Sequence, residues 1–371
     1  MVFVPGAAAA LEELRRGPFD MVVSDMRMPG MDGATLLAKV KEGWPSTTRV
    51  VLSGHSEREA VMRVLPIAQQ FLGKPCDGGS LRSVIERNCK IQEILTNQEL
   101  RAFIGKLDKI PSSPGIYLEM SSAIADPMFS AADLAKIVER DPAMATKVLQ
   151  LVNSAYFGLA RKVSSVTTAV PYLGFELLRN LALTIEIFSS LDTCTVQGFS
   201  PAAFQHESFL TARVAKLISP DSSLEPDSFT AGLLHDVGQV VLAMGKPREF
   251  QAALKASAGA GPALHVVEKE LLGFTHAEVG AYLLGSWGLP LAIVESTAFH
   301  HSPLASSEQP LFGPLTAVHV ADALVHGVLQ GDREEAKRLQ LPYLEMLGVA
   351  DRLPAWRTLV AREHAAAQAS A

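Results

Sequence analysis

The hydrophobic pattern divides the chain into two parts that differ in secondary structure. Up to about residue 76, apolar runs of strand length alternate with segments of helical periodicity. The pattern predicts strands over 2–4, 19–24, 49–53 and 69–73, and helices over 7–16 and 34–42. Strands separated by helices of about ten residues are typical of parallel βαβ units. We therefore expect an α/β domain in this part.

From about residue 78 onward, the pattern indicates helices only. Apolar residues recur three and four positions apart, as at Leu134, Ile137 and Val138, which is the period of a helix that buries one face. Pro142 and Pro201 stand where the first residue of a helix is expected. We therefore expect a multidomain protein in which an all-α bundle follows the α/β domain.

A single helix joins the two parts. Leu81, Val84, Asn88, Ile91 and Leu95 follow a 3,4,3,4 spacing, which is the seam of a coiled coil with one polar core position. Such a seam would support a homodimer through the 81–95 helix. Two heptads are too few to exclude an ordinary helix packed on its own chain, so both interpretations stay open.

Composition narrows the class of protein. The 371 residues are 48% hydrophobic and 19% charged, with a formal net charge of −6, which is typical of a globular protein. The chain has no long basic run, so we expect no nucleic-acid partner. It has no apolar run of about 18 residues and no signal-like start, so we expect no membrane partner and a cytoplasmic location. The three cysteines share no metal-like spacing.

Three polar side chains stand at the ends of predicted strands. Asp25, Ser53 and Lys74 each follow an apolar run. Because the carboxyl ends of parallel strands meet at one edge of a sheet, we expect these side chains to converge. A carboxylate nucleophile beside a hydroxyl and an ammonium group suits transfer of a phosphoryl group onto the aspartate.

These residues, together with the D-x-x-M-P-x-x-D-G loop at 25–33, resemble the receiver domain of two-component response regulators. The resemblance implies a flavodoxin-like fold, a histidine kinase as phosphodonor and Mg²⁺ as cofactor. It implies that Asp25 is the phosphoacceptor and that the Arg27 carbonyl binds the magnesium. It further implies that the receiver switch consists of Ser53, Phe71 and Lys74.

The receiver pattern is incomplete at its start. The first strand of a receiver carries an acidic pair that binds magnesium, and no acidic pair precedes Val2. Either the start of the chain is called too late or the receiver is degenerate, and we expect residues 1–80 to form a partial receiver without its first strand and helix. Magnesium should bind weakly there, and Asp25 should be phosphorylated poorly.

Several motifs of the second part occur in a fixed order. They are Ile110-Pro111-Ser112-Ser113-Pro114, Asp141-Pro142-Ala143, the run 151–158 that contains Asn153, Val163-Ser164-Ser165-Val166, and Leu173-Gly174. Together they resemble the HDOD domain, a helical output module related to HD phosphohydrolases. The resemblance implies a signalling or protein-interaction module without a settled enzymatic activity. We assign 81–107 to a helical linker, 108–305 to the HDOD domain and 306–371 to a C-terminal helical extension.

Eight of the ten histidines lie between residues 206 and 326. By resemblance to HD-family metallohydrolases, the order H…HD…D implies a divalent metal site for Mn, Fe or Zn with the ligands His206, His235, Asp236 and Asp322. The same resemblance implies a possible second site that adds His276, His300 and His301, as in HD-GYP phosphodiesterases. We expect the remaining histidines of this region to lie on helix faces rather than to bind metal: His265, His319 and His326.

Two departures weigh against catalysis. HD-GYP enzymes have a lysine three positions after the HD pair, where this chain has Gln239, and their Gly-Tyr-Pro segment is replaced by Ser302-Pro303-Leu304. We therefore favour a response regulator whose receiver is coupled to a non-enzymatic HDOD output that binds a protein partner. The alternative is a metal-dependent phosphodiesterase or phosphohydrolase, and it stays open.

Overall fold

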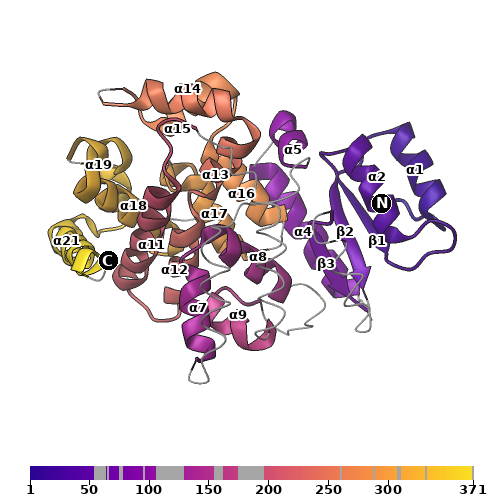
Figure 1. The fold of residues 1–371 in the computed structure, drawn as a ribbon, viewed down its shortest axis with the longest axis horizontal. Helices are drawn as coiled ribbons and strands as arrows, with labels where there is room; N and C mark the ends of the chain where they lie inside the picture. Colours follow the sequence, from indigo (N-terminus) through magenta and orange to yellow (C-terminus); the bar gives the residue numbers. More distant parts are fainter. Residues whose placement is uncertain are drawn as a thin grey trace.

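The protein has two units, a small α/β unit at one end and a larger helical unit. In the computed structural model the two chain ends lie at opposite ends of the molecule (Figure 1). The structure describes residues 1–53, 64, 67–74, 78–94, 97–105, 129–153, 162–173, 196–259, 261–286, 289–306, 311–330 and 332–369.

The α/β unit confirms the predicted parallel arrangement. Its elements are α1 (Ala7–Arg16), β1 (Met21–Asp25), α2 (Gly33–Gly43), β2 (Thr48–Ser53) and β3 (Gln70–Gly73). In the described residues the strands are parallel in the order β1-β2-β3. Because side chains alternate between the two faces of a strand, Val22 and Val51 pack on the side of α2. Val50 packs on the opposite side, against Val84 of the linker helix.

The predicted strand over residues 2–4 is wrong. These residues adopt no strand, and their side chains are 53%, 83% and 38% exposed. A strand needs a neighbour to satisfy its backbone groups, and in the described part of the chain β1 pairs only with β2. The apolar Val2-Phe3-Val4 run is therefore left in solvent.

The second unit is helical, as predicted. Its α-helices are α4 (Gly78–Ile94), α5 (Gln98–Gly105), α7 (Ala131–Glu139), α8 (Pro142–Val152), α9 (Val166–Leu173), α11 (Pro201–Ile218), α12 (Glu225–Leu234), α13 (Val237–Gly245), α14 (Pro247–Ser257), α15 (Leu264–Leu272), α16 (His276–Ser286), α17 (Leu291–Phe299), α18 (Pro314–Gln330), α19 (Asp332–Arg338), α20 (Leu341–Met346) and α21 (Leu353–Ala369). Two short 3₁₀ helices, η1 (Pro303–Ala305) and η2 (Ala350–Arg352), complete it. One continuous apolar core runs through these helices.

Helix α16 is almost completely buried. Every residue of the helix except Glu278 is buried. A Cβ atom at Gly238 of α13 would lie 1.9 Å from the carbonyl oxygen of His276. Only glycine allows α13 to approach the start of α16 this closely.

The linker helix α4 packs on its own chain. Val84 joins the core of the α/β unit, whereas Ile91 joins the helical core and contacts the backbone at Gly285. Asn88 is buried and donates from Nδ2 to the Val84 carbonyl, 2.8 Å away. Val84, Asn88 and Ile91 thus have contacts within the chain, Leu95 lies outside the described residues, and the homodimer stays a prediction.

Candidate functional site

The receiver edge brings Asp25 and Lys74 together. Lys74 Nζ donates to Asp25 Oδ2, and the Arg27 amide donates to Asp25 Oδ1 over 3.1 Å. Burial raises the pKa of Asp25, but the Lys74 ammonium and the Arg27 amide lower it below its usual value. The backbones of Ser53 and Phe71 lie in β2 and β3, but their side chains lie outside the described residues.

The D-x-x-M-P-x-x-D-G loop has a structural explanation. A Cβ atom at Gly33 would lie 2.0 Å from the Asp25 carbonyl oxygen, so the loop can close only on glycine. Asp32 caps α2 by accepting from the Thr35 amide over 2.8 Å. In the described residues Asp25 is therefore the one carboxylate of this loop that remains for magnesium, and weak magnesium binding stays a prediction.

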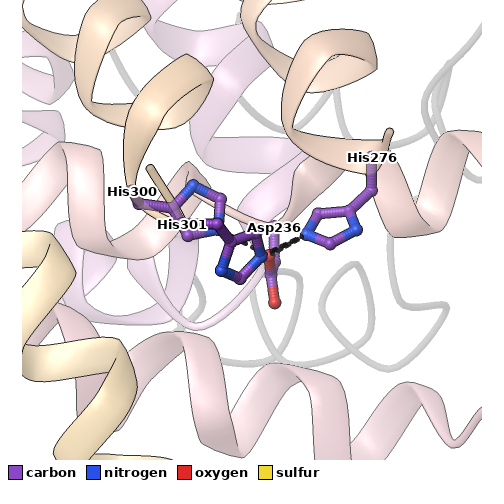
Figure 2. A group of neighbouring side chains, drawn as sticks. All are labelled: Asp236, His276, His300 and His301. Atoms are coloured by element: carbon purple, nitrogen blue, oxygen red, sulfur yellow. Dashed lines mark hydrogen bonds and ion pairs between the residues drawn. The ribbon is translucent and has the colours of Figure 1, made fainter. Parts of the chain in front are cut away.

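The helical unit brings four further side chains together in what we call the histidine group: Asp236, His276, His300 and His301. Asp236 is the N-cap residue of α13, His276 begins α16, and the paired histidines follow α17. His276 approaches the Asp236 carboxylate from one side, and His300 and His301 approach it from the other (Figure 2). All four are buried, with exposed fractions between 0% and 7%.

The spacing in the histidine group suits a metal ion. His276 Nε2 and His300 Nε2 lie 3.1 Å and 3.4 Å from Asp236 Oδ1, and His276 Nε2 lies 2.9 Å from His301 Nε2. Metal–ligand bonds of about 2.1 Å place neighbouring ligand atoms roughly 3.0–3.4 Å apart. Asp236 Oδ1, His300 Nε2 and His301 Nδ1 are buried without a hydrogen-bond partner, and a cation would offset the cost of burying them.

The surrounding contacts orient these rings. His276 Nδ1 donates to Glu268 Oε2 over 2.6 Å, and His300 Nδ1 donates to the Thr297 carbonyl over 2.8 Å. Each contact turns Nε2 toward the centre of the group. Burial lowers the pKa of His276, but the carboxylates of Glu268 and Asp236 raise it to about 10.

A second set of side chains, which we call the aspartate group, shares one member with the first: His235, Asp236 and Asp322. His235 Nε2 lies 3.5 Å from Asp236 Oδ2 and 3.4 Å from Asp322 Oδ1. Burial raises the pKa of Asp322, but the Arg338 guanidinium holds it well below the usual range. Asp322 lies on α18 and Arg338 ends α19, so both side chains come from the part of the chain that follows η1.

The structure does not bring His206 into either group. This residue is exposed, and its ring packs edge-on against His364 at a centroid distance of 5.9 Å. The next residue, Glu207, points toward His326 instead, with 3.7 Å between Oε2 and Nε2. Consecutive residues of a helix point about 100° apart. His206 therefore lies on a different face of α11 from Glu207, and it does not join the predicted ligands.

The other three histidines belong to neither group, and His319 and His326 are buried. His319 is fully buried: its Nδ1 donates to the His300 carbonyl over 2.7 Å, and its Nε2 accepts from the Gln340 amide over 3.0 Å. Both of its ring nitrogens are thus in use. His265 stacks on His301 at 4.2 Å, and His326 is buried on α18.

A cavity of about 280 Å³ lies beside the aspartate group. Its lining includes Glu207, Gln239, His326 and Arg338, but no member of either group. Gln239 donates to Asp236 Oδ2 over 2.6 Å. The residue that replaces the lysine of HD-GYP enzymes therefore binds the shared aspartate from the cavity side.

Among the motifs that resemble the HDOD domain, Asn153 and Asp141 are described by the structure and have structural roles. Asn153 and Val163 exchange two hydrogen bonds of 2.7 Å between the Asn153 side chain and the Val163 backbone. Asp141 caps α8 by accepting from the Met144 amide over 3.0 Å. Residues 110–114, 154–158 and Gly174 lie outside the described residues.

Comparison with known proteins assigns the helical unit. The family model of the HDOD domain matches residues 110–303, more than half of the chain. The chain belongs to the HDOD family. The model of the response regulator receiver domain matches residues 2–86. A receiver followed by an HDOD domain is the composition of a signal-transduction response regulator.

Relatives match one or both of these parts. An uncharacterized Treponema pallidum protein is 30% identical over 252 residues, which are 66% of this chain and 48% of that protein. The DNA-binding transcriptional regulator NtrC of Escherichia coli is 35% identical over 81 residues, 22% of this chain and 17% of NtrC. The chain thus spans about half the length of the first relative and less than a fifth of the second.

A solved structure shares the fold. The MmoQ response regulator of Methylococcus capsulatus has 25% sequence identity and a TM-score of 0.50, covering 65% of this chain and 98% of that one. In the part of this chain that the structure describes, no helix is both long and apolar enough to cross a bilayer.

Proposed function

We propose that a histidine kinase signals to this chain through phosphorylation of Asp25, and that the HDOD domain passes the signal to a protein partner without hydrolysing a substrate. The receiver then acts as a switch with two conformations, and the helical unit reads its state. Phosphorylation of Asp25 needs magnesium to neutralise the charge on the transferring oxygens.

The observation that carries this proposal is the position of α16 between the two units. Tyr282 of α16 is 4% exposed, and its hydroxyl lies beside Thr48 at the start of β2. Ile91 of the linker helix contacts the same helix at Gly285. Because α16 begins at His276, a displacement at the receiver reaches the histidine group through one rigid element.

We further propose that the histidine group binds a divalent ion with a structural role. Three imidazoles and one carboxylate are a donor set for Zn, Fe or Mn, and an ion there would act as a Lewis acid if substrate could reach it. None of Asp236, His276, His300 and His301 lines the cavity. A substrate in this cavity would meet Gln239, which stands where HD-GYP enzymes have a lysine, and this replacement supports a non-enzymatic output.

Hydrogen exchange tests the coupling. The protein would be treated with acetyl phosphate in excess magnesium, and modification of Asp25 would be measured by intact mass. We expect modification to change amide exchange in 276–286, with no change in the Asp25→Asn variant. Full modification with unchanged exchange in α16 would contradict the proposal.

The second candidate function is a metal-dependent phosphohydrolase, which the buried His/Asp set favours. It predicts that the protein loaded with Mn²⁺ or Fe²⁺ hydrolyses phosphodiesters and that Asp236→Asn abolishes the activity. We expect no turnover above that of the Asp236→Asn control, and activity lost in this variant would replace the non-enzymatic proposal.

A further inference from the structure

The two groups differ in how many of their carboxylate oxygens already accept hydrogen bonds from neighbouring side chains. In the aspartate group, Arg338 Nη1 donates to Asp322 Oδ1 over 3.3 Å and to Oδ2 over 3.1 Å. Gln239 holds Asp236 Oδ2, and His326 Nδ1 lies 3.1 Å from Asp322 Oδ1. Of the aspartate group, the atoms left without a partner are His235 Nε2 and Asp236 Oδ1.

The oxygen atom without a partner faces the histidine group. Asp236 Oδ1 is the atom approached by His276 and His300, at 3.1 Å and 3.4 Å. The two oxygens of Asp236 therefore face different neighbours. Oδ2 faces the neutral side-chain amide of Gln239. Oδ1 faces Nε2 of His276 and His300, whose Nδ1 atoms are already hydrogen-bonded.

Arg338 is itself a buried cation. Its side chain is 11% exposed, and a guanidinium keeps its charge at any pH at which a protein is folded. It neutralises Asp322, which otherwise would be a buried carboxylate in need of a counter-charge. A divalent ion bound to Asp322 would stand next to this fixed positive charge and would have to displace its hydrogen bonds.

We infer that the HDOD domain of this chain holds a single divalent ion, in the histidine group, and that Arg338 supplies the positive charge in the aspartate group that a second ion would otherwise supply. The inference rests on the proposed metal binding by the histidine group and adds its stoichiometry. Chemistry that needs two ions about 3.5–4 Å apart is then excluded by a residue of the C-terminal extension.

Metal counting tests this inference on the full chain. Metal-free protein would be titrated with Mn²⁺, and bound ions would be counted by native mass spectrometry. We expect one ion in the unaltered protein, one in Arg338→Lys, which keeps the charge, two in Arg338→Gln, and none in His276→Ala. Circular dichroism would show which variants are folded.

The electron paramagnetic resonance spectrum of bound Mn²⁺ gives a readout that needs no variant. One isolated ion per chain gives the six-line spectrum of mononuclear Mn²⁺, whereas two neighbouring ions give an exchange-coupled spectrum. Two ions in the unaltered protein would overturn the inference. One ion in the unaltered protein and also one in a folded Arg338→Gln variant would overturn it too. Neither result would contradict metal binding by the histidine group. No bound ion in the unaltered protein would overturn the proposed metal binding as well.

Discussion

At the residue scale, the most consequential side chain outside the histidine group is Glu268. Its Oε2 accepts from both the backbone amide and the ring Nδ1 of His276, over 2.8 Å and 2.6 Å. The carboxylate is 0% exposed. It therefore sets the orientation of the ring and increases its basicity toward a metal.

We expect Glu268→Gln to weaken divalent metal binding by about 10–100-fold, because a neutral amide no longer increases the basicity of His276. Competition with a chromogenic chelator measures the affinity. The matched control is Glu270→Gln on the same helix, whose side chain is exposed. Equal affinities in both variants would show that Glu268 does not position the ring.

The Asp25–Lys74 pair yields a prediction about pH. The folded-state pKa of Asp25 is lowered, so the pair stabilises the folded protein above the unfolded value of 3.8 and this contribution is lost as the pH falls below it. Both side chains are more than a third exposed, so the effect on stability is small. Lys74→Met should raise the pKa of Asp25, as followed by carboxyl ¹³C chemical shifts. A pKa that stays in place would show that the ammonium is not its cause.

At the element scale, the approach of α13 to α16 decides where His276 stands. Gly238 permits this approach, and Gly280 of α16 lies in the same contact. Thr275 and Glu278 form a capping box at the start of α16: Glu278 accepts from the Thr275 amide over 2.7 Å, and Thr275 Oγ1 accepts from the Glu278 amide over 3.1 Å.

Gly238→Ala should lower the free energy of unfolding by about 1–3 kcal/mol, because the added methyl group must push the start of α16 away. It should also weaken metal binding, since His276 moves with the helix. Urea unfolding and the chelator assay measure the two effects. The control is Gly43→Ala, at a helical position where a Cβ atom meets nothing within 4 Å, and it should change neither the stability nor the metal affinity. A Gly238→Ala variant as stable as the unaltered protein would refute the close-packing explanation.

At the scale of the whole molecule, an ion in the histidine group ties together α13, α16 and the segment after α17. Ligands that bind only the folded state stabilise it by mass action, by about 2.7 kcal/mol at a free concentration one hundred times the dissociation constant. The α/β unit has its own apolar clusters, separate from the helical core.

Removing the ion with a chelator should therefore lower the melting temperature of the helical unit and leave amide protection in β1 and β2 unchanged. Thermal scans and hydrogen exchange with and without chelator measure this. His206→Ala should respond to the chelator as the unaltered protein does, because His206 is exposed and outside the group. Loss of protection in both units together would mean that they unfold as one.

The sequence by itself determined the class of fold and most of the candidate site. Periodicity predicted α1 and the strand of Asp25 because a buried strand or helix face must be apolar at a regular spacing. Resemblance to HD-family metallohydrolases grouped His235, Asp236 and Asp322, and the structure brings these three side chains together. Metal binding by them stays a prediction. A three-residue apolar run at 2–4 was misread because pairing, not local preference, makes a strand.

Only the tertiary structure decided the partners of these residues. His206 and Glu207 are neighbours in sequence, and which of them points inward depends on how α11 rotates against α18. Glu268 and Arg338 look like ordinary surface charges on amphipathic helices, and no spacing connects them to His276 or Asp322. Their burial follows from packing of α15 and α19 against the core, which brings together side chains that a sequence pattern cannot relate.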